Sequence, residues 1–196
     1  MAIRILPYLV PASVVASLVV CWLGAARTRE AHRVATRQVN VERFTAISSK
    51  PFKEVESKIE SGVGHPDMAA LLFKIAAAKN QADLDSVVNS AVGPTGLIEF
   101  NKFDLGEVLR KESGNNAQAV RLLVGNPLIM KQMVKLVPDA GSYAPVTILI
   151  DQRGDGVHVC YDTMASFLAP YGNKQALEVA RNLDAKIEEL IKVAAF

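Results

Sequence analysis

The stretch "APVTILIDQRGDGVHVCYD", residues 144–162, decides the fold. Two runs rich in β-branched residues flank "RGDG", a tetrapeptide with two glycines and an aspartate. Runs of this kind on either side of a short glycine-containing turn predict a β-hairpin. We therefore expect two antiparallel strands here and build the rest of the domain around them.

The second arm of this hairpin, "VHVCYD", resembles a chemical site. Alternate side chains of a strand share a face, so His158, Cys160 and Asp162 point the same way. Neighbours in this set lie about 6.5 Å apart along the strand, so they cannot close a metal or nucleophile site among themselves. The preferred interpretation is an edge or hairpin strand whose mixed face points outward. Ligand binding by these three residues is the alternative.

Local signals place further elements on both sides of the hairpin. Runs rich in β-branched residues predict three more strands, at residues 39–49, 97–103 and 118–126. Apolar periodicity and capping residues predict helices at residues 49–64, 65–80, 80–96, 126–137 and 173–196, and a short helix or turn at 104–116. Suitable N-caps precede or begin most of these helices: Ser49, Asp67, Asn80, Asn126 and Asn173.

The order of these elements is β-α-(α-α)-β-β-α-β-β-α. Interleaved helices and hairpins predict an α+β domain, in which a mostly antiparallel sheet carries its helices on one face. The pair of helices at about residues 65–92 is expected to be an insert in this domain.

The N-terminus has a different character from the rest of the chain. Residues 5–26 carry no charge, and a helix of about 20 apolar residues spans the hydrocarbon core of a bilayer. We expect a membrane segment at residues 1–26, a basic linker at 27–38 and the α+β domain at 39–196. A secretory signal cleaved after the small residues 24–26 is the alternative.

Arginines around this segment bear on its orientation. Four of them lie between residues 27 and 37, against Arg4 on the other side. The positive-inside rule then predicts a single-pass membrane protein with a cytoplasmic domain, whereas an ordinary signal anchor would export the domain to the periplasm.

Composition excludes some classes of partner and site. The net charge of the 196 residues is only +2 and aromatic residues make up 6%, so we expect no nucleic-acid binding. The two cysteines, Cys21 and Cys160, form no zinc-binding motif, and no metal site is predicted. Neither nucleotide-binding glycine fingerprint is present, and no cofactor is identified.

Two further motifs are candidates for ligand binding. Gly125 and Asn126 precede a predicted helix, whose free N–H groups could hold an anion, although a glycine turn with an asparagine cap is the preferred interpretation. Asp104 and Glu107 share a helical spacing that suits acid–base chemistry. A capping pair accounts for them equally well.

Four segments of the chain, in order, resemble domain-of-unknown-function family 302. They are "RFTAISSKPFKEVESKIESGVG", "GLIEFNKFDLGEVLRKE", "RLLVGNPLIMKQMVKLVPDAGSYAPVTILI" and "VHVCYDTMASFLAPYG". The resemblance runs from about residue 41 to the C-terminus. It implies a TBP-like α+β fold with a β-α-β4-α core, allows a homodimer, and transfers no catalytic residues.

These observations predict a membrane-anchored domain that binds a small ligand or a partner without catalysis. A thiol- and histidine-dependent enzyme or redox protein using Cys160 and His158 is the rival. The sequence does not decide whether the protein is an enzyme.

Overall fold

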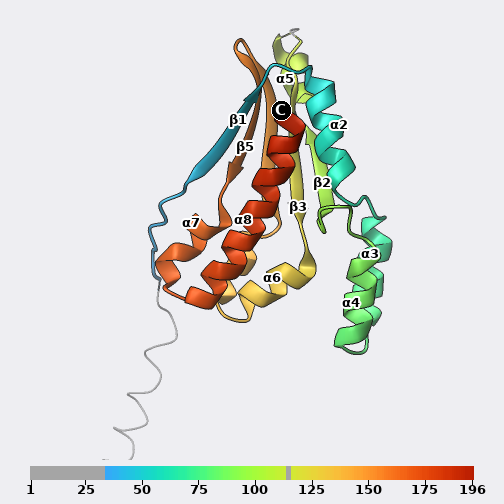
Figure 1. The fold of residues 1–196 in the computed structure, drawn as a ribbon, viewed down its shortest axis with the longest axis vertical. Helices are drawn as coiled ribbons and strands as arrows, with labels where there is room; N and C mark the ends of the chain where they lie inside the picture. Colours follow the sequence, from blue (N-terminus) through green and yellow to red (C-terminus); the bar gives the residue numbers. More distant parts are fainter. Residues whose placement is uncertain (1–33, 114–115) are drawn as a thin grey trace, which may run out of the picture. The chain divides into compact units, whose positions relative to one another are not determined.

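The predicted hairpin forms the middle of the sheet in this computed structural model (Figure 1). Strand β4 (Val146–Arg153) pairs antiparallel with β5 (Gly156–Asp162), and Ile150 lies opposite Val159. The structure describes residues 34–113 and 116–196. In these ranges five strands form one antiparallel sheet in the order β1-β5-β4-β3-β2.

The other elements follow the predicted order closely. The remaining strands are β1 (Arg43–Ser48), β2 (Ile98–Asp104) and β3 (Ala119–Gly125). The α-helices are α2 (Phe52–Gly62), α3 (Met68–Ala77), α4 (Gln81–Asn89), α5 (Leu105–Ser113), α6 (Pro127–Val134), α7 (Met164–Leu168) and α8 (Lys174–Ala195). Two short 3-10 helices are η1 (Pro138–Ser142) and η2 (Ala169–Tyr171).

Strand β5 is the second arm of the hairpin, as predicted, and lies in the interior of the sheet rather than at an edge. It pairs with β4 on one side and with β1 on the other, where Thr45 lies opposite Cys160. The pairing with β1 joins segments more than a hundred residues apart, and the pattern within "VHVCYD" holds no sign of it.

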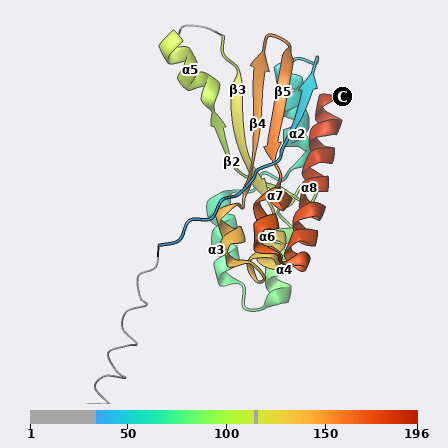
Figure 2. The same cartoon turned by 90° about the vertical axis from the view of Figure 1, so that its left-hand side faces the viewer.

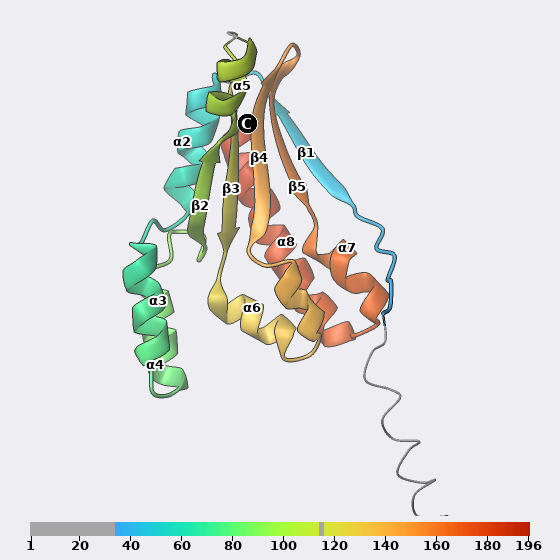
Figure 3. The same ribbon diagram turned by 180° about the vertical axis from the view of Figure 1, so that it is seen from behind.

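Helices α2 and α8 cover one face of the sheet, and no helix of the described residues covers the other, which we call the bare face (Figure 3). Alternate residues of β5 face the covered side: Val157, Val159 and Tyr161. We call the apolar cluster between this face and the helices the main core. It includes 28 buried residues of the described chain, among them an apolar stripe of α8: Ala176, Ala180, Leu183, Ile187, Leu190, Ile191 and Ala194.

The remaining helices lie beyond the ends of the strands, so the prediction that all helices share one face was too simple. Figure 2 shows α3, α4, α6 and α7 gathered at one end of the sheet, whereas α5 lies at the other. Helices α3 and α4 form a small core of their own with the start of β2. Its buried members are Leu71, Val88 and Ile98, and we call it the satellite core.

Two glycines fix the helical pair α3–α4 where the chain enters and leaves it. A Cβ on Gly64 would lie 2.0 Å from the Ala91 carbonyl oxygen, and one on Gly93 would lie 2.3 Å from the Val63 carbonyl carbon. Both glycine N–H groups donate to the Leu97 carbonyl at 2.9 Å. The entering and leaving segments therefore touch through their backbones, which only glycine permits.

Four of the five predicted helix caps are confirmed. Asp67, Asn80, Asn126 and Asn173 each accept a hydrogen bond from a backbone N–H in the first turn of their helix. Ser49 does not cap α2, because that helix starts three residues later, with Pro51 as a cap that makes no side-chain bond.

The predicted membrane segment at residues 1–26 and most of the basic linker lie outside the described residues. Among the helices that the structure describes, none is both long and apolar enough to cross a membrane. Residues Val39–Phe196 form one compact unit, which contains every element discussed below.

Candidate functional site

An apolar cavity of about 230 Å³ lies where the main core and the satellite core meet. We call it the junction cavity. Its lining comes from α3, β2, the end of β3, α6, the start of β4 and α8: Leu72, Ile75, Phe100, Val124, Gly125, Asn126, Pro127, Met130, Met133, Ala144, Pro145, Val146 and Leu183. None of these side chains is ionisable, so the cavity suits an uncharged ligand.

The cavity exists because neither core fills the space between them. Val124, Met133 and Leu183 belong to the main core, whereas Ile75 and Phe100 pack on the satellite core. Gly125 leaves further room, since a Cβ there would lie 3.5 Å from the Pro145 Cβ and 3.6 Å from the Phe100 ring. These are ordinary contact distances, so the position tolerates a side chain that would enter this space.

The turn at Gly125 and Asn126 lines this apolar cavity, and Asn126 caps α6 as the preferred interpretation of the sequence has it. Asn126 Oδ1 accepts hydrogen bonds from the N–H groups of Leu128 and Ile129, at 2.7 and 3.4 Å. Asn126 Nδ2 donates to the Gly96 carbonyl at 2.8 Å. The donors at this helix start are thus already used, and the turn offers an apolar surface rather than an anion cradle.

His158, Cys160 and Asp162 share the bare face, and each has a different partner. His158 Nε2 lies 2.8 Å from Asp155 Oδ1, and Thr45 Oγ1 donates to Cys160 Sγ at 3.6 Å. Both residues are buried, with exposed fractions of 7% and 8%. In the described chain no hydrogen bond joins His158 to Cys160, so the thiol–histidine alternative has no nucleophile–base pair here.

Asp162 is held by a neighbouring cation. Arg43 donates to its two carboxylate oxygens at 2.6 and 2.8 Å. These bonds lower the pKa of Asp162, because they stabilise its charged form. The Asp162 carboxylate is therefore ionised, and both of its oxygens are paired with Arg43.

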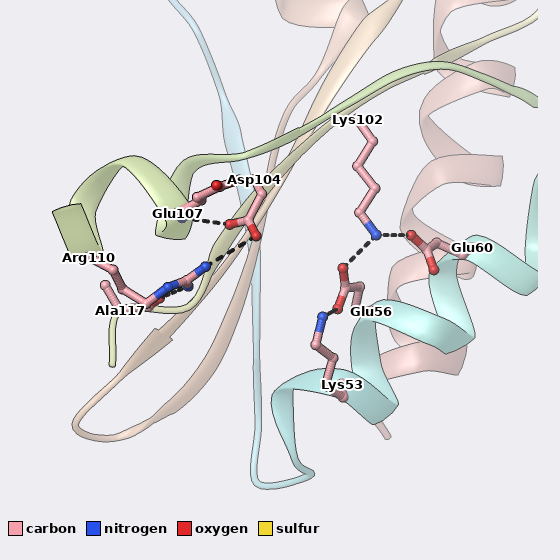
Figure 4. A network of polar contacts seen from close by, with 8 residues as sticks. All are labelled: Lys53, Glu56, Glu60, Lys102, Asp104, Glu107, Arg110 and Ala117. Atoms are coloured by element: carbon pink, nitrogen blue, oxygen red, sulfur yellow. Dashed lines mark hydrogen bonds and ion pairs between the residues drawn. The ribbon is translucent and has the colours of Figure 1, made fainter. Parts of the chain in front are cut away.

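Asp104 and Glu107 form the start of α5, as the capping interpretation predicts (Figure 4). Asp104 Oδ1 accepts from the Glu107 N–H at 2.8 Å, which lowers the pKa of Asp104. Its other oxygen lies 3.4 Å from Arg110, whose Nη1 donates to the Ala117 carbonyl at 2.6 Å. These contacts fix α5 against the start of β3 at the far end of the sheet from the junction cavity.

Figure 4 also shows an ion network that the sequence analysis missed. Glu56 of α2 is buried and lies 2.7 Å from both Lys53 and Lys102, and Lys102 also pairs with Glu60. Burial would raise the pKa of Glu56, but the bonds from the two lysines outweigh burial and lower it. The only signal in the sequence is a glutamate directly beside Val55 in the apolar stripe of α2.

A second missed residue is Asp184, which is buried in α8. It accepts hydrogen bonds from the Tyr161 hydroxyl at 2.5 Å and from the N–H groups of Met164 and Ala165 at 2.8 and 2.9 Å. Burial raises the pKa of Asp184, although these donors act the other way. The network joins β5, α7 and α8 inside the main core.

A second hollow of about 380 Å³ lies on the bare face, and we call it the outer-face cleft. Its lining is mixed in chemistry: Arg121, Leu123, Ser142, Tyr143, Ala144, Pro145, Val146, Thr147, Asp162 and Phe167. The segment at residues 144–146 lines both this cleft and the junction cavity. Asp162 is the sequence-predicted residue that lies in the cleft.

A family model described as "Domain of unknown function DUF302" matches residues 73–194. The chain belongs to this family. Membership confirms the resemblance over the matched range and assigns no activity, since the function of DUF302 is unknown. No curated protein matches the chain.

One DUF302 structure supports the fold. The crystal structure of an uncharacterized conserved DUF302 protein from Bacillus stearothermophilus has a TM-score of 0.54 and 13% sequence identity, over 78% of this chain and 97% of that chain. At this identity the likeness concerns the fold alone.

Proposed function

We propose that this DUF302 protein is a non-catalytic module that binds a small uncharged apolar molecule in the junction cavity. The observation that carries the proposal is a cavity walled by two separate apolar cores and lined by no ionisable side chain. Such cavities stay dry and take up apolar ligands. An ionic group placed there would lose its hydration without gaining a partner.

The size of the cavity limits the ligand. A dry cavity of about 150 Å³ admits benzene in other proteins, so about 230 Å³ suits a substituted aromatic ring or a short branched chain. Met130 and Met133 give the walls flexible, polarisable side chains that adapt to such shapes. Leu72 lines the cavity and is 57% exposed, which places the opening at α3.

The chemistry of the ligand also fits the N-terminus that the sequence predicts. Uncharged apolar molecules partition into lipid, and an anchor at residues 5–26 would hold the module beside that reservoir. The binding proposal does not depend on the anchor.

Methionine methyl NMR offers a direct test, because the chain has five methionines. Met130 and Met133 line the cavity, whereas Met164 is buried elsewhere in the main core. We expect toluene, added to protein with ¹³C-methyl methionine, to shift the methyl signals of Met130 and Met133 saturably and to leave Met164 in place. Equal shifts at all buried methionines, or none at the two lining ones, would contradict the proposal.

A variant that fills the cavity completes the test. In Gly125→Leu the Cβ fits at contact distance and the remaining carbons enter the cavity, so toluene binding should fall by about tenfold or more. Gly154→Leu, at a glycine with open space around it, is the matched control and should bind toluene normally. An unchanged Met164 signal shows that each variant is folded.

A further inference from the structure

We propose that the outer-face cleft is a second ligand site, separate from the junction cavity, that takes a small aromatic carboxylate through Arg121. The cleft is lined from β3, the start of β4, the end of β5 and α7, and Figure 3 shows these elements from the face that α2 and α8 do not cover. The proposal rests on the charge, the aromatic wall and the unused hydroxyl groups of this hollow.

The charge of the cleft is positive and comes from one residue. Arg121 and Asp162 are the lining residues that carry a charge at neutral pH, and Arg43 already binds both oxygens of Asp162. Arg121 is exposed and forms no salt bridge with any part of the chain that the structure describes. Its guanidinium lies over the Phe103 ring, 5.5 Å from the centroid. An exposed guanidinium without a salt bridge suits a carboxylate, which it binds with two parallel hydrogen bonds.

An aromatic wall stands in the same cleft. The rings of Tyr143 and Phe167 stack with centroids 4.7 Å apart and planes 12° from parallel. The Tyr143 hydroxyl lies 3.0 Å from the Tyr171 hydroxyl, which restrains the stack. A planar aromatic ligand would extend this stack and bury apolar area against it, with Leu123 also in the lining.

Two hydroxyl groups complete the site. Ser142 and Thr147 line the cleft, and within residues 34–113 and 116–196 neither side chain makes a hydrogen bond. They can donate to a carboxylate oxygen or accept from a ring substituent. A single cation with two neutral donors fits a monoanion, whereas a phosphate dianion needs more positive charge.

The test uses benzoate as the probe and benzamide as its uncharged analogue. We expect benzoate to shift the backbone signals of Tyr143 and Thr147, and benzamide to bind about tenfold more weakly or worse, as loss of a charge-assisted pair implies. Comparable binding of benzamide, or full displacement of benzoate by equimolar inorganic phosphate, would overturn the carboxylate assignment.

Matched arginine variants locate the site. Arg121→Gln should weaken benzoate binding about tenfold or more, while Arg153→Gln should leave it unchanged. Arg153 pairs with Asp151 at the hairpin end of β4, outside the cleft. Equal losses in both variants would show a non-specific charge effect and overturn the proposal.

The same titration separates this site from the junction cavity. Benzoate that shifts the methyl signals of Met130 and Met133, rather than the signals of Tyr143 and Thr147, would place it in the junction cavity and contradict the second site. Toluene binding at the two methionines is read independently, so either proposal can fail while the other holds.

Discussion

The main core and the satellite core differ in size and in how they are built. The main core packs a five-stranded sheet against two long helices and contains 28 buried residues of the described chain, whereas the satellite core has three. Ligand sites tend to lie in the less stable parts of a protein, because those parts open at low free-energy cost. The junction cavity lies on this boundary, with one wall from each core.

The largest loss of stability should come from removing the polar network of Asp184 inside the main core. Asp184→Ala leaves the Tyr161 hydroxyl and two backbone N–H groups buried without their acceptor, at about 1–3 kcal/mol each. We expect the free energy of unfolding to fall by about 3–5 kcal/mol, measured by urea denaturation. Glu178→Ala, on an exposed position of the same helix, is the control and should stay within about 0.5 kcal/mol. A loss below about 1 kcal/mol in Asp184→Ala would show that the network does not support the main core.

A matched pair of leucine truncations compares the two cores directly. Leu122→Ala in the main core should cost about 3–5 kcal/mol of global stability. Leu71→Ala in the satellite core should cost about 2 kcal/mol and act locally, because few other buried side chains depend on it. Hydrogen exchange checks this: in Leu71→Ala, faster exchange should be confined to α3 and α4. Faster exchange throughout the sheet would mean that the two cores unfold as one.

The ion network of Glu56 should contribute less to the free energy of unfolding, and its contribution should depend on pH. It joins α2 of the main core to β2, the strand that also carries Ile98 of the satellite core. Glu56→Gln should cost about 1.5–3 kcal/mol at pH 7, the range for hydrogen bonds to charged groups.

The sign of the pH dependence follows from the lowered pKa of Glu56. Its stabilising effect is fully present above the ordinary value of 4.5 and is lost as pH falls through the lower pKa of the folded protein. The stability gap between wild type and Glu56→Gln should therefore shrink from pH 5 to pH 3 in urea titrations. A gap that stays constant over this range would exclude the ionised pair as its cause.

Local signals were enough to predict most elements, and non-local packing explains what they missed. The hairpin, the helix caps at Asp67 and Asn126 and the stripe of α8 depend on neighbours within a few residues. The interior position of β5 and the buried role of Asp184 depend on segments far away in the chain, so no local pattern reveals them.

The candidate site shows the same limit. The turn at Gly125 and Asn126 was singled out from the sequence as a capped helix start or an anion site, and its place in an apolar cavity was not predicted. Asn126 uses the helix N–H groups itself, and the α3–α4 pair brings Ile75 beside the turn. The cap follows from the turn's own residues, whereas the place of Ile75 depends on a distant segment and is not visible from them.

The most direct test of a ligand site between the two cores is a set of intermolecular nuclear Overhauser effects between bound toluene and the protein. We expect contacts from the toluene protons to Met133 and Leu183 of the main core and to Ile75 on the satellite side, all of which line the cavity. Contacts only to exposed side chains such as Phe73, with none to Met133, would contradict it.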